Sequence, residues 1–185
     1  VLTVMLNIIA LWKQEARNRA ATTARDNAPS FKQVWKIFIA RPKTMRLLVS
    51  VGLGSAAFSM QDVLLEPYGG QILGLSVGAT TSLTALWAVG MLTGFSLAAR
   101  ALSKGGEPHR LAGFGATAGI AAFLFVVFAG PLGSAPLLAI GATIIGFGGG
   151  LFSVGALTVE MNISDECRNG LSLGAWGAVQ ATSGG

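Results

Sequence analysis

The chain has 185 residues, of which 52% are apolar and 11% are charged, and its formal net charge is +5. This composition, with 26 glycines, suits a helical membrane protein better than a soluble domain. The basic excess does not indicate nucleic-acid binding, because Lys and Arg flank hydrophobic runs instead of alternating with stacking aromatics on a folded face. Cys167 is the only cysteine, which excludes a disulfide within the chain, and metal-ligand spacing is absent.

The first predicted element is a short apolar stretch over residues 1–12. It would form about 18 Å of helix, too little to cross roughly 30 Å of hydrocarbon. We interpret it as the end of a span that begins before this sequence. The absence of an initiator Met and of a signal-peptide pattern favours an internal piece of a longer protein.

A basic connection follows over residues 13–46. Its stretch 16–28 has the composition of a linker, and Ser30 is a candidate helix N-cap. Beyond Ser30, aromatic and apolar residues recur at helical spacing until Pro42: Phe31, Val34, Trp35 and Phe38. We interpret this segment as a helix lying in the membrane interface. The alternative is a cytoplasmic extension of the next span.

Four apolar runs long enough to cross a membrane come next, and a fifth begins near the end of the sequence. They are predicted over residues 47–65, 76–99, 111–130 and 137–159, with the fifth from Gly170 onwards. Pro67, with Gly69 and Gly70, is expected to stop the first run. Gly130 and Pro131 are expected to close the third.

The distribution of positive charge predicts the orientation of these spans. All 13 Lys and Arg residues fall in alternate connections, within residues 13–46, 100–110 and 160–169. The connections around residues 67–74 and 131–135 contain none. Because cytoplasmic loops carry an excess of Lys and Arg, the three basic segments are predicted to be cytoplasmic.

Glycine pairs at a spacing of four residues predict close helix packing. There is one such pair on each of four runs: Gly90 and Gly94, Gly115 and Gly119, Gly146 and Gly150, and Gly170 and Gly174. Small residues at this spacing let helix backbones approach closely. A functional alternative is that Gly146 and Gly148 to Gly150 flatten a helix face against a planar ligand, or let the helix bend.

Ionisable residues inside a span are the strongest candidates for function. Asp62 and Glu66 are four residues apart, so their carboxylates share one helix face, and Gln61 adds a neutral polar group beside them. The alternative is a solvated helix end. Glu160, Asp165 and Glu166 are interpreted as a solvated loop, and His109, the only histidine, as a loop residue.

The sequence contains no recognisable set of catalytic residues. There is no Ser/His/Asp set, no phosphate-binding loop and no metal cluster. We therefore expect the protein not to be an enzyme.

The residues Gln61 to Thr81 read QDVLLEPYGGQILGLSVGATT. Together with FKQVWKIFIARP before them and RNGLSLGAWGAVQAT near the end, they closely resemble the PucC/LhaA family of photosynthetic bacteria, a branch of the major facilitator superfamily. The similarity runs through most of the chain, and DVLLEPYGG is its most specific stretch.

This resemblance implies an all-α fold: a polytopic membrane helix bundle that forms the C-terminal half of a twelve-helix protein with both termini in the cytoplasm. It places residues 1–12 at the end of helix 6 and residues 13–46 in the cytoplasmic central loop with its interfacial helix. Residues 47–185 become the C-terminal transmembrane bundle, helices 7 to 10 and the start of helix 11. The orientation predicted from charge is the same.

The resemblance further implies an integral membrane assembly factor for bacterial light-harvesting antenna complexes. Such a factor would handle or deliver bacteriochlorophyll while antenna polypeptides join, in the bacterial inner, intracytoplasmic photosynthetic membrane. Its implied partners are antenna polypeptides, photosynthetic complexes, bacteriochlorophyll and the lipid bilayer. Some relatives carry the label of a bacteriochlorophyll synthase subunit, which no residue pattern here supports.

One superfamily signature is altered. The loop between helices 8 and 9 normally has Gly, then an acidic residue, then several basic residues. Here Gly94 is followed by FSLAARALSKGGEPHR, which contains Arg100, Lys104 and Arg110 but no acid at that place. The departure weakens the inference of an ordinary ion-coupled transport cycle, although this signature is often degenerate in the second half of such proteins.

The candidates for contact with pigment or partner are Asp62, Glu66 and Tyr68, with Gln61 beside them. Carboxylate oxygen is a suitable hard ligand for magnesium, and a tyrosine hydroxyl can donate a hydrogen bond. Apolar surface for pigment tails, or for lipid and neighbouring helices, is offered by Trp87, Phe123, Phe125 and Phe128.

Two other functions remain open at this point. One is a secondary transporter that moves a small amphipathic molecule by alternating access, with the acidic pair lining a central cavity. The other is a structural subunit that stays bound in a photosynthetic complex.

Overall fold

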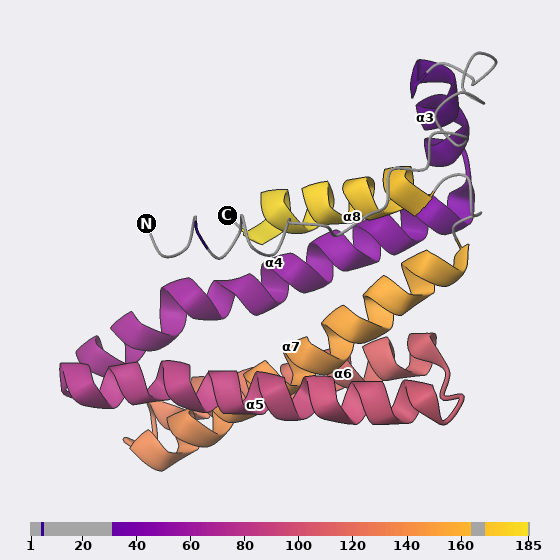
Figure 1. The fold of residues 1–185 in the computed structure, drawn as a ribbon. Coiled ribbons are helices and arrows are strands. Elements are labelled where there is room, and N and C mark those ends of the chain that lie inside the picture. The colour runs from indigo at the N-terminus through magenta and orange to yellow at the C-terminus, as the bar shows by residue number, and fades with distance from the viewer. Residues whose placement is uncertain (1–4, 6–30, 164–168, 185) are drawn as a thin grey trace. The chain divides into compact units, whose positions relative to one another are not determined.

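The computed structural model describes Met5, residues 31–163 and residues 169–184. The stretches predicted for residues 1–12 and 16–28, the candidate cap Ser30, and Asp165, Glu166 and Cys167 lie outside these residues. The described residues form helices and contain no strand (Figure 1). The helices are α3 (Phe31–Ile39), α4 (Pro42–Gln71), α5 (Val77–Ser103), α6 (Pro108–Ala129), α7 (Ala135–Ile163) and α8 (Asn169–Gly184).

Helix α3 matches the predicted amphipathic segment and is separate from α4. Its Trp35 and Phe38 rings lie against each other with centroids 5.9 Å apart. The helix ends at Ile39 and α4 begins at Pro42, because a residue before proline is driven into an extended conformation; Arg41 has φ −79° and ψ 115°. The segment is therefore not a continuous extension of the following span. Its place in the membrane interface stays a prediction.

Helices α4, α5, α6 and α7 are long and apolar enough to cross a membrane. At 22 to 30 residues, each exceeds the roughly 20 residues that a span requires. The four predicted runs are confirmed as helices, and α4 and α7 extend beyond both predicted bounds, whereas α5 extends at its C-terminal end and α6 at its N-terminal end. Helix α8, over Asn169–Gly184, begins where the fifth run was predicted.

Helix α4 corrects one prediction, since it continues through Pro67 to Gln71. A proline inside a helix removes one backbone hydrogen bond and favours a break. Here tertiary contacts hold the last turn: Gly69 is buried, and a Cβ on it would lie 3.3 to 3.4 Å from Leu75, Thr80 and Leu138. The chain reverses three residues later at Gly74, whose φ of +63° suits glycine.

Helix α7 is the centre of the bundle formed by residues 39–185, and it packs against α5 on one side and α6 on the other (Figure 1). Helix α8 lies along α4 (Figure 1). The apolar core is built around the first half of α7, where Leu138 and Ile145 are fully buried. Leu65 of α4, Leu83 of α5 and Ala122 of α6 complete it.

Glycines make the contact between α5 and α7 possible. A Cβ on Gly90 would clash with the Thr143 carbonyl oxygen, and one on Gly94 with that of Phe147. From the other side, a Cβ on Gly146 would clash with the Trp87 carbonyl oxygen, and one on Gly150 would lie 2.7 Å from that of Met91. The two helix backbones therefore touch without intervening side chains, as the spacing predicted.

A second glycine face of α7 meets α6. A Cβ on Gly148 would lie 2.7 Å from the Gly115 carbonyl oxygen, and one on Gly155 would lie 2.6 Å from the Ala112 amide nitrogen. Gly119 instead makes room for the Phe58 ring of α4. Since helix backbones or a phenylalanine ring cover these glycine positions, α7 does not offer them to a planar ligand in this structure.

The pair Gly170 and Gly174 differs from the other three. Nothing lies within 4 Å of a Cβ built on either residue. The predicted close packing at this pair is therefore absent from the described part of the chain. Helix α8 instead approaches α4 elsewhere, where a Cβ on Gly52 would lie 3.1 Å from Val179 and 3.3 Å from Ser183.

Candidate functional site: a polar face of α4 between four helices

A polar stripe runs along one face of helix α4. It consists of Ser55, Ser59, Asp62 and Glu66, at successive spacings of four, three and four residues, which places all of them on one side of a helix. Asp62 and Glu66 are exposed. Gln61, beside the stripe, is 5% exposed and donates a hydrogen bond to the Asp62 carboxylate.

The outer part of the stripe lines a small cavity against helix α5. The cavity has a volume of about 190 Å³ and includes Gln61, Asp62 and Glu66. On the α5 side, the Thr84 hydroxyl donates a 3.2 Å hydrogen bond to Glu66 Oε1. Most serine and threonine hydroxyls of the described spans bond to their own helix, so Thr84 is distinguished by pointing at a carboxylate on another helix.

The inner part of the stripe lines a second cavity of about 120 Å³. It shares Gln61, Asp62 and Trp87 with the first cavity. Ser153 of α7 and Gln180 of α8 also line it. Polar groups from three helices, with the Trp87 indole of α5, thus converge at one level of the bundle.

Sequence reasoning missed Ser153, Gln180 and Thr84 as members of this site. Single serines, threonines and glutamines are common in membrane helices, and they carry no charge that would attract attention. The sequence does not show which side of its own helix each of these residues presents to α4. Only the packing of α5, α7 and α8 around α4 reveals that Thr84 contacts Glu66 and that Ser153 and Gln180 line a cavity with Asp62.

The depth of the site follows from the length of α4. The stretch from Arg46 to Asp62 corresponds to about 24 Å of helix, inside a hydrocarbon layer of roughly 30 Å. If Arg46 marks the basic boundary, Glu66 lies at the opposite boundary and Asp62 one turn deeper. Ser55 and Ser59 then lie at mid-membrane depth.

Tyr68 has a different position from the acidic pair. Its hydroxyl donates to the Val127 carbonyl oxygen at 3.4 Å and accepts from the Gly130 amide at 3.0 Å. Val127 and Gly130 belong to the end of α6 and its cap. Tyr68 therefore links the end of α4 to the end of α6 through these two hydrogen bonds. It does not line the cavity that contains Asp62 and Glu66.

We expect Tyr68→Phe to destabilise the bundle by about 1 kcal/mol, since it removes two hydrogen bonds of modest net value. The measurement is the unfolding midpoint of the purified full-length gene product in mild detergent. The pigment content of the purified variant should equal that of the wild type. Lost pigment binding at unchanged stability would contradict this structural role and restore Tyr68 as a contact residue.

Glu160 corrects another prediction. It lies within α7 instead of a solvated loop, and only 1% of its surface is exposed. The Ser172 hydroxyl of α8, itself 2% exposed, hydrogen-bonds to its carboxyl group. Buried polar groups are stabilised by such partners, so this contact ties the end of α7 to the start of α8.

The aromatic residues named as possible tail contacts divide into two groups. Trp87 and Phe123 are partly buried and pack against the core. Phe125 and Phe128 are exposed on α6, at 37% and 55%. They belong to an apolar outer surface of the kind that lipid covers.

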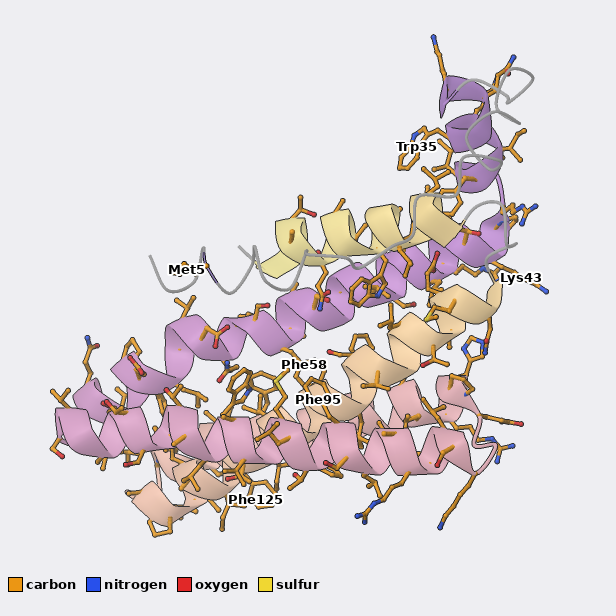
Figure 2. All side chains as sticks on the ribbon, in the orientation of Figure 1. Met5, Trp35, Lys43, Phe58, Phe95 and Phe125 are labelled. Carbon is orange, nitrogen blue, oxygen red and sulfur yellow. The ribbon has the colours of Figure 1, made fainter. Side chains whose placement is uncertain are left out.

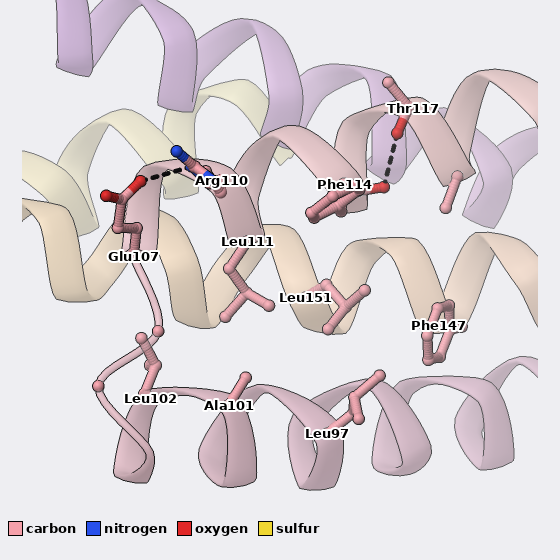
Figure 3. Close-up of a pocket in the computed structure, with 13 residues that line it drawn as sticks. Leu97, Ala101, Leu102, Glu107, Arg110, Leu111, Phe114, Thr117, Phe147 and Leu151 are labelled. Carbon is pink, nitrogen blue, oxygen red and sulfur yellow. Dashed lines mark hydrogen bonds and ion pairs between the residues drawn. The ribbon is translucent and has the colours of Figure 1, made fainter.

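A larger cavity lies away from the acidic pair, between α5, α6 and α7 (Figure 3). Its volume is about 900 Å³, and its wall is mostly apolar, with Leu97, Phe114 and Leu151 among its members. At the rim, Arg110 Nε and Glu107 Oε2 form an ion pair of 2.6 Å (Figure 3). The cavity offers shape and apolar surface but few directed polar groups.

The chemistry of the α4 site is that of binding. Two carboxylates, an amide and hydroxyl groups can accept or donate hydrogen bonds and can coordinate a hard cation that a ligand brings. Within residues 31–163 and 169–184, no group of three or more His, Cys, Asp or Glu residues is placed to hold a metal ion by itself.

These features define a multi-pass, all-helical membrane protein with a polar site between its spans. The family model described as PUCC protein matches residues 1–185. The chain therefore belongs to the PucC family, as the motif around DVLLEPYGG predicted.

Curated relatives align along nearly the whole chain. Protein PucC of Rhodovulum sulfidophilum is 50% identical over 100% of this chain and 41% of its own length. The "uncharacterized protein in puhA-bchM intergenic region" of Rhodobacter capsulatus is 50% identical over 100% of this chain and 39% of its own length. The "bacteriochlorophyll synthase 44.5 kDa chain" of the same species is 30% identical over 98% and 43%.

The chain thus spans about two fifths of the length of the curated relatives it matches. No solved structure matches it.

Proposed function

We propose that this chain is part of an assembly factor for bacterial light-harvesting antenna complexes, and that it handles bacteriochlorophyll while antenna polypeptides join. Membership in the PucC family supports this proposal. The name of one relative refers to bacteriochlorophyll synthase, and that of another to a region between puhA and bchM. The proposed role is binding and delivery, not catalysis.

The observation that carries the proposal is the exposed acidic pair at membrane depth. Asp62 and Glu66 share a face of α4 with Ser55 and Ser59. An ionised side chain costs roughly 2.5–3.5 kcal/mol at the bilayer centre and less toward the interface, so Asp62, one turn inside the boundary, carries part of that cost when it faces lipid. This face is therefore better suited to water, a ligand or another polypeptide than to lipid.

Bacteriochlorophyll suits this face as a cargo. Its central magnesium is a hard cation that takes oxygen ligands, which Asp62 and Glu66 supply. Trp87 lines both cavities beside them, and aromatic side chains favour stacking on flat rings. Gln61 and Thr84 orient the two carboxylates through their hydrogen bonds.

The wider architecture belongs to the same proposal. We propose that the bundle is the C-terminal half of a major facilitator-type protein in the intracytoplasmic photosynthetic membrane. Sites in that superfamily lie near the bilayer midplane at the interface of the two halves. The inner cavity, which Ser55 and Ser59 line, is the one at midplane depth if Arg46 marks the basic boundary.

Deletion of the gene tests the proposed function. We expect the deletion strain to lose most absorption from at least one antenna complex under photosynthetic growth, and plasmid-borne wild-type protein to restore it. Pulse-labelling would show antenna polypeptides that are made but not assembled. Normal assembly kinetics together with stoichiometric recovery of the protein in a photosynthetic complex would favour a structural subunit instead.

A secondary transporter is the second candidate, because polar cavities between spans are also the sites at which transporters bind substrate. Uptake or export of an amphipathic molecule in sealed vesicles would then depend on the proton gradient. Absence of such gradient-dependent transport in vesicles that contain the protein would exclude this candidate.

A further inference from the structure

A second site lies at the basic end of the bundle, between α4, α6 and α7. A cavity of about 460 Å³ is found there, a size typical of ligand pockets. Three basic side chains line it: Lys43 and Arg46 from the start of α4, and His109 from the start of α6. Lys43 projects from that end of α4 (Figure 2).

The sequence did not predict this convergence. Lys43 and Arg46 are three residues apart and share a helix face, whereas His109 is distant in the chain and was interpreted as a loop residue. The contact of α6 with α7 at Gly155 fixes the position of the α6 start, since a Cβ on Gly155 would lie 2.9 Å from the Pro108 carbonyl oxygen. The histidine is thereby held at the cavity.

The charge of the cavity is unbalanced. Within the part of the chain that the structure describes, no acidic side chain lines this cavity or pairs with Lys43, Arg46 or His109. The nearby acid Glu107 is paired with Arg110. Arginine and lysine side chains that converge in this way favour a phosphate group, which arginine can bind with two parallel hydrogen bonds.

The interior of the cavity is apolar. Apart from Ser50, the other residues that line it are apolar: Leu47, Val51, Ala112, Phe152, Ala156 and Val159. The stretch from Lys43 to Val51 corresponds to about 12 Å of helix, so the cavity extends from the basic boundary into the hydrocarbon layer. A free phosphate ion would leave this interior unfilled, whereas an amphiphile with an anionic head would fill both parts.

We propose that this cavity binds an anionic phospholipid of the leaflet on the basic side of the protein. Lys43, Arg46 and His109 hold the phosphate, and the apolar wall around Phe152 takes the beginning of an acyl chain. Anionic lipid is concentrated in the leaflet that faces basic segments. The site is separate from the acidic pair and does not depend on the proposed function.

The test measures lipid binding to the purified full-length gene product by native mass spectrometry, after delipidation and addition of defined lipids. We expect phosphatidylglycerol to bind about tenfold or more tightly than phosphatidylcholine of the same chain length. The triple variant Lys43→Gln, Arg46→Gln, His109→Gln should lose this preference, because it removes the basic residues that favour a lipid of net negative charge over a zwitterionic lipid with the same phosphate. Lys104→Gln, a basic residue outside this cavity, is the matched control and should keep it.

Three outcomes would overturn the proposal: equal binding of the two lipids, an unchanged preference in the triple variant, or full displacement of phosphatidylglycerol by millimolar inorganic phosphate. The last outcome would identify a site for free phosphate only. The unfolding midpoint of each variant without lipid is measured in parallel. If the triple variant unfolds early, Arg46→Gln alone should still weaken phosphatidylglycerol binding more than phosphatidylcholine binding.

Discussion

Replacing Asp62 with asparagine and Glu66 with glutamine is expected to lower antenna assembly close to the level of a deletion strain. The substitutions keep the size of both side chains but remove the charges that would bind a magnesium centre or a donor group. Loss of one hydrogen bond to a charged group costs about 1.5–3 kcal/mol, which corresponds to roughly 10-fold to 150-fold weaker binding. Antenna absorption in whole membranes is the measurement.

The stability of this double variant separates function from folding. Removing charge from a span lowers the cost of membrane insertion, so the variant should accumulate at least as well as the wild type. Glu107→Gln is the matched control, because it removes a carboxylate from the α5–α6 connection, outside both polar cavities. Wild-type antenna levels in the double variant would show that the acidic pair has no role in assembly.

The second large effect concerns the crossing of α5 and α7. Gly146→Ala is expected to destabilise the bundle by about 1–3 kcal/mol, the usual cost of overpacking. The added Cβ would clash with the Trp87 carbonyl oxygen and would lie 2.9 Å from the Trp87 carbonyl carbon. Backbone atoms cannot move aside as a flexible side chain can, so the two helices must separate. The unfolding midpoint in detergent measures the loss.

Gly113→Ala is the matched control, and it is expected not to lower the stability of the bundle. Gly113 lies within α6, and a Cβ there would meet nothing within 4 Å. Alanine is favoured over glycine in a helix interior by up to about 1 kcal/mol, so this variant should be as stable as the wild type or slightly more stable. If the unfolding midpoint of Gly146→Ala equalled that of Gly113→Ala, the result would contradict the backbone contact between α5 and α7.

Sequence reasoning predicted the helices well because their signals are local. Apolar runs of about 20 residues can be satisfied in lipid only by a helix or a closed barrel, and glycine spacing marked three of the four predicted contact faces. Pro67 misled the prediction for α4, since its local preference was overridden by contacts of Gly69 and Tyr68 with distant residues. The prediction that Glu160 lies in a solvated loop was wrong for the same kind of reason, because Glu160 is held by a contact with Ser172 of another helix.

The candidate site could be predicted only in part. The spacing of Asp62 and Glu66 placed both carboxylates on one face of α4, and the structure shows that face lining a cavity. The partners Thr84, Ser153 and Gln180 depend on how other helices rotate against α4, which a single sequence does not encode locally. The convergence of His109 with Lys43 and Arg46 has the same cause.

The most direct test of the proposed role is gentle purification of the full-length gene product from photosynthetically grown membranes, followed by an absorption spectrum and mass spectrometry of its partners. We predict bound bacteriochlorophyll together with antenna polypeptides, and loss of the pigment from the Asp62→Asn, Glu66→Gln variant. A colourless protein without antenna partners would contradict the proposal and favour the transporter.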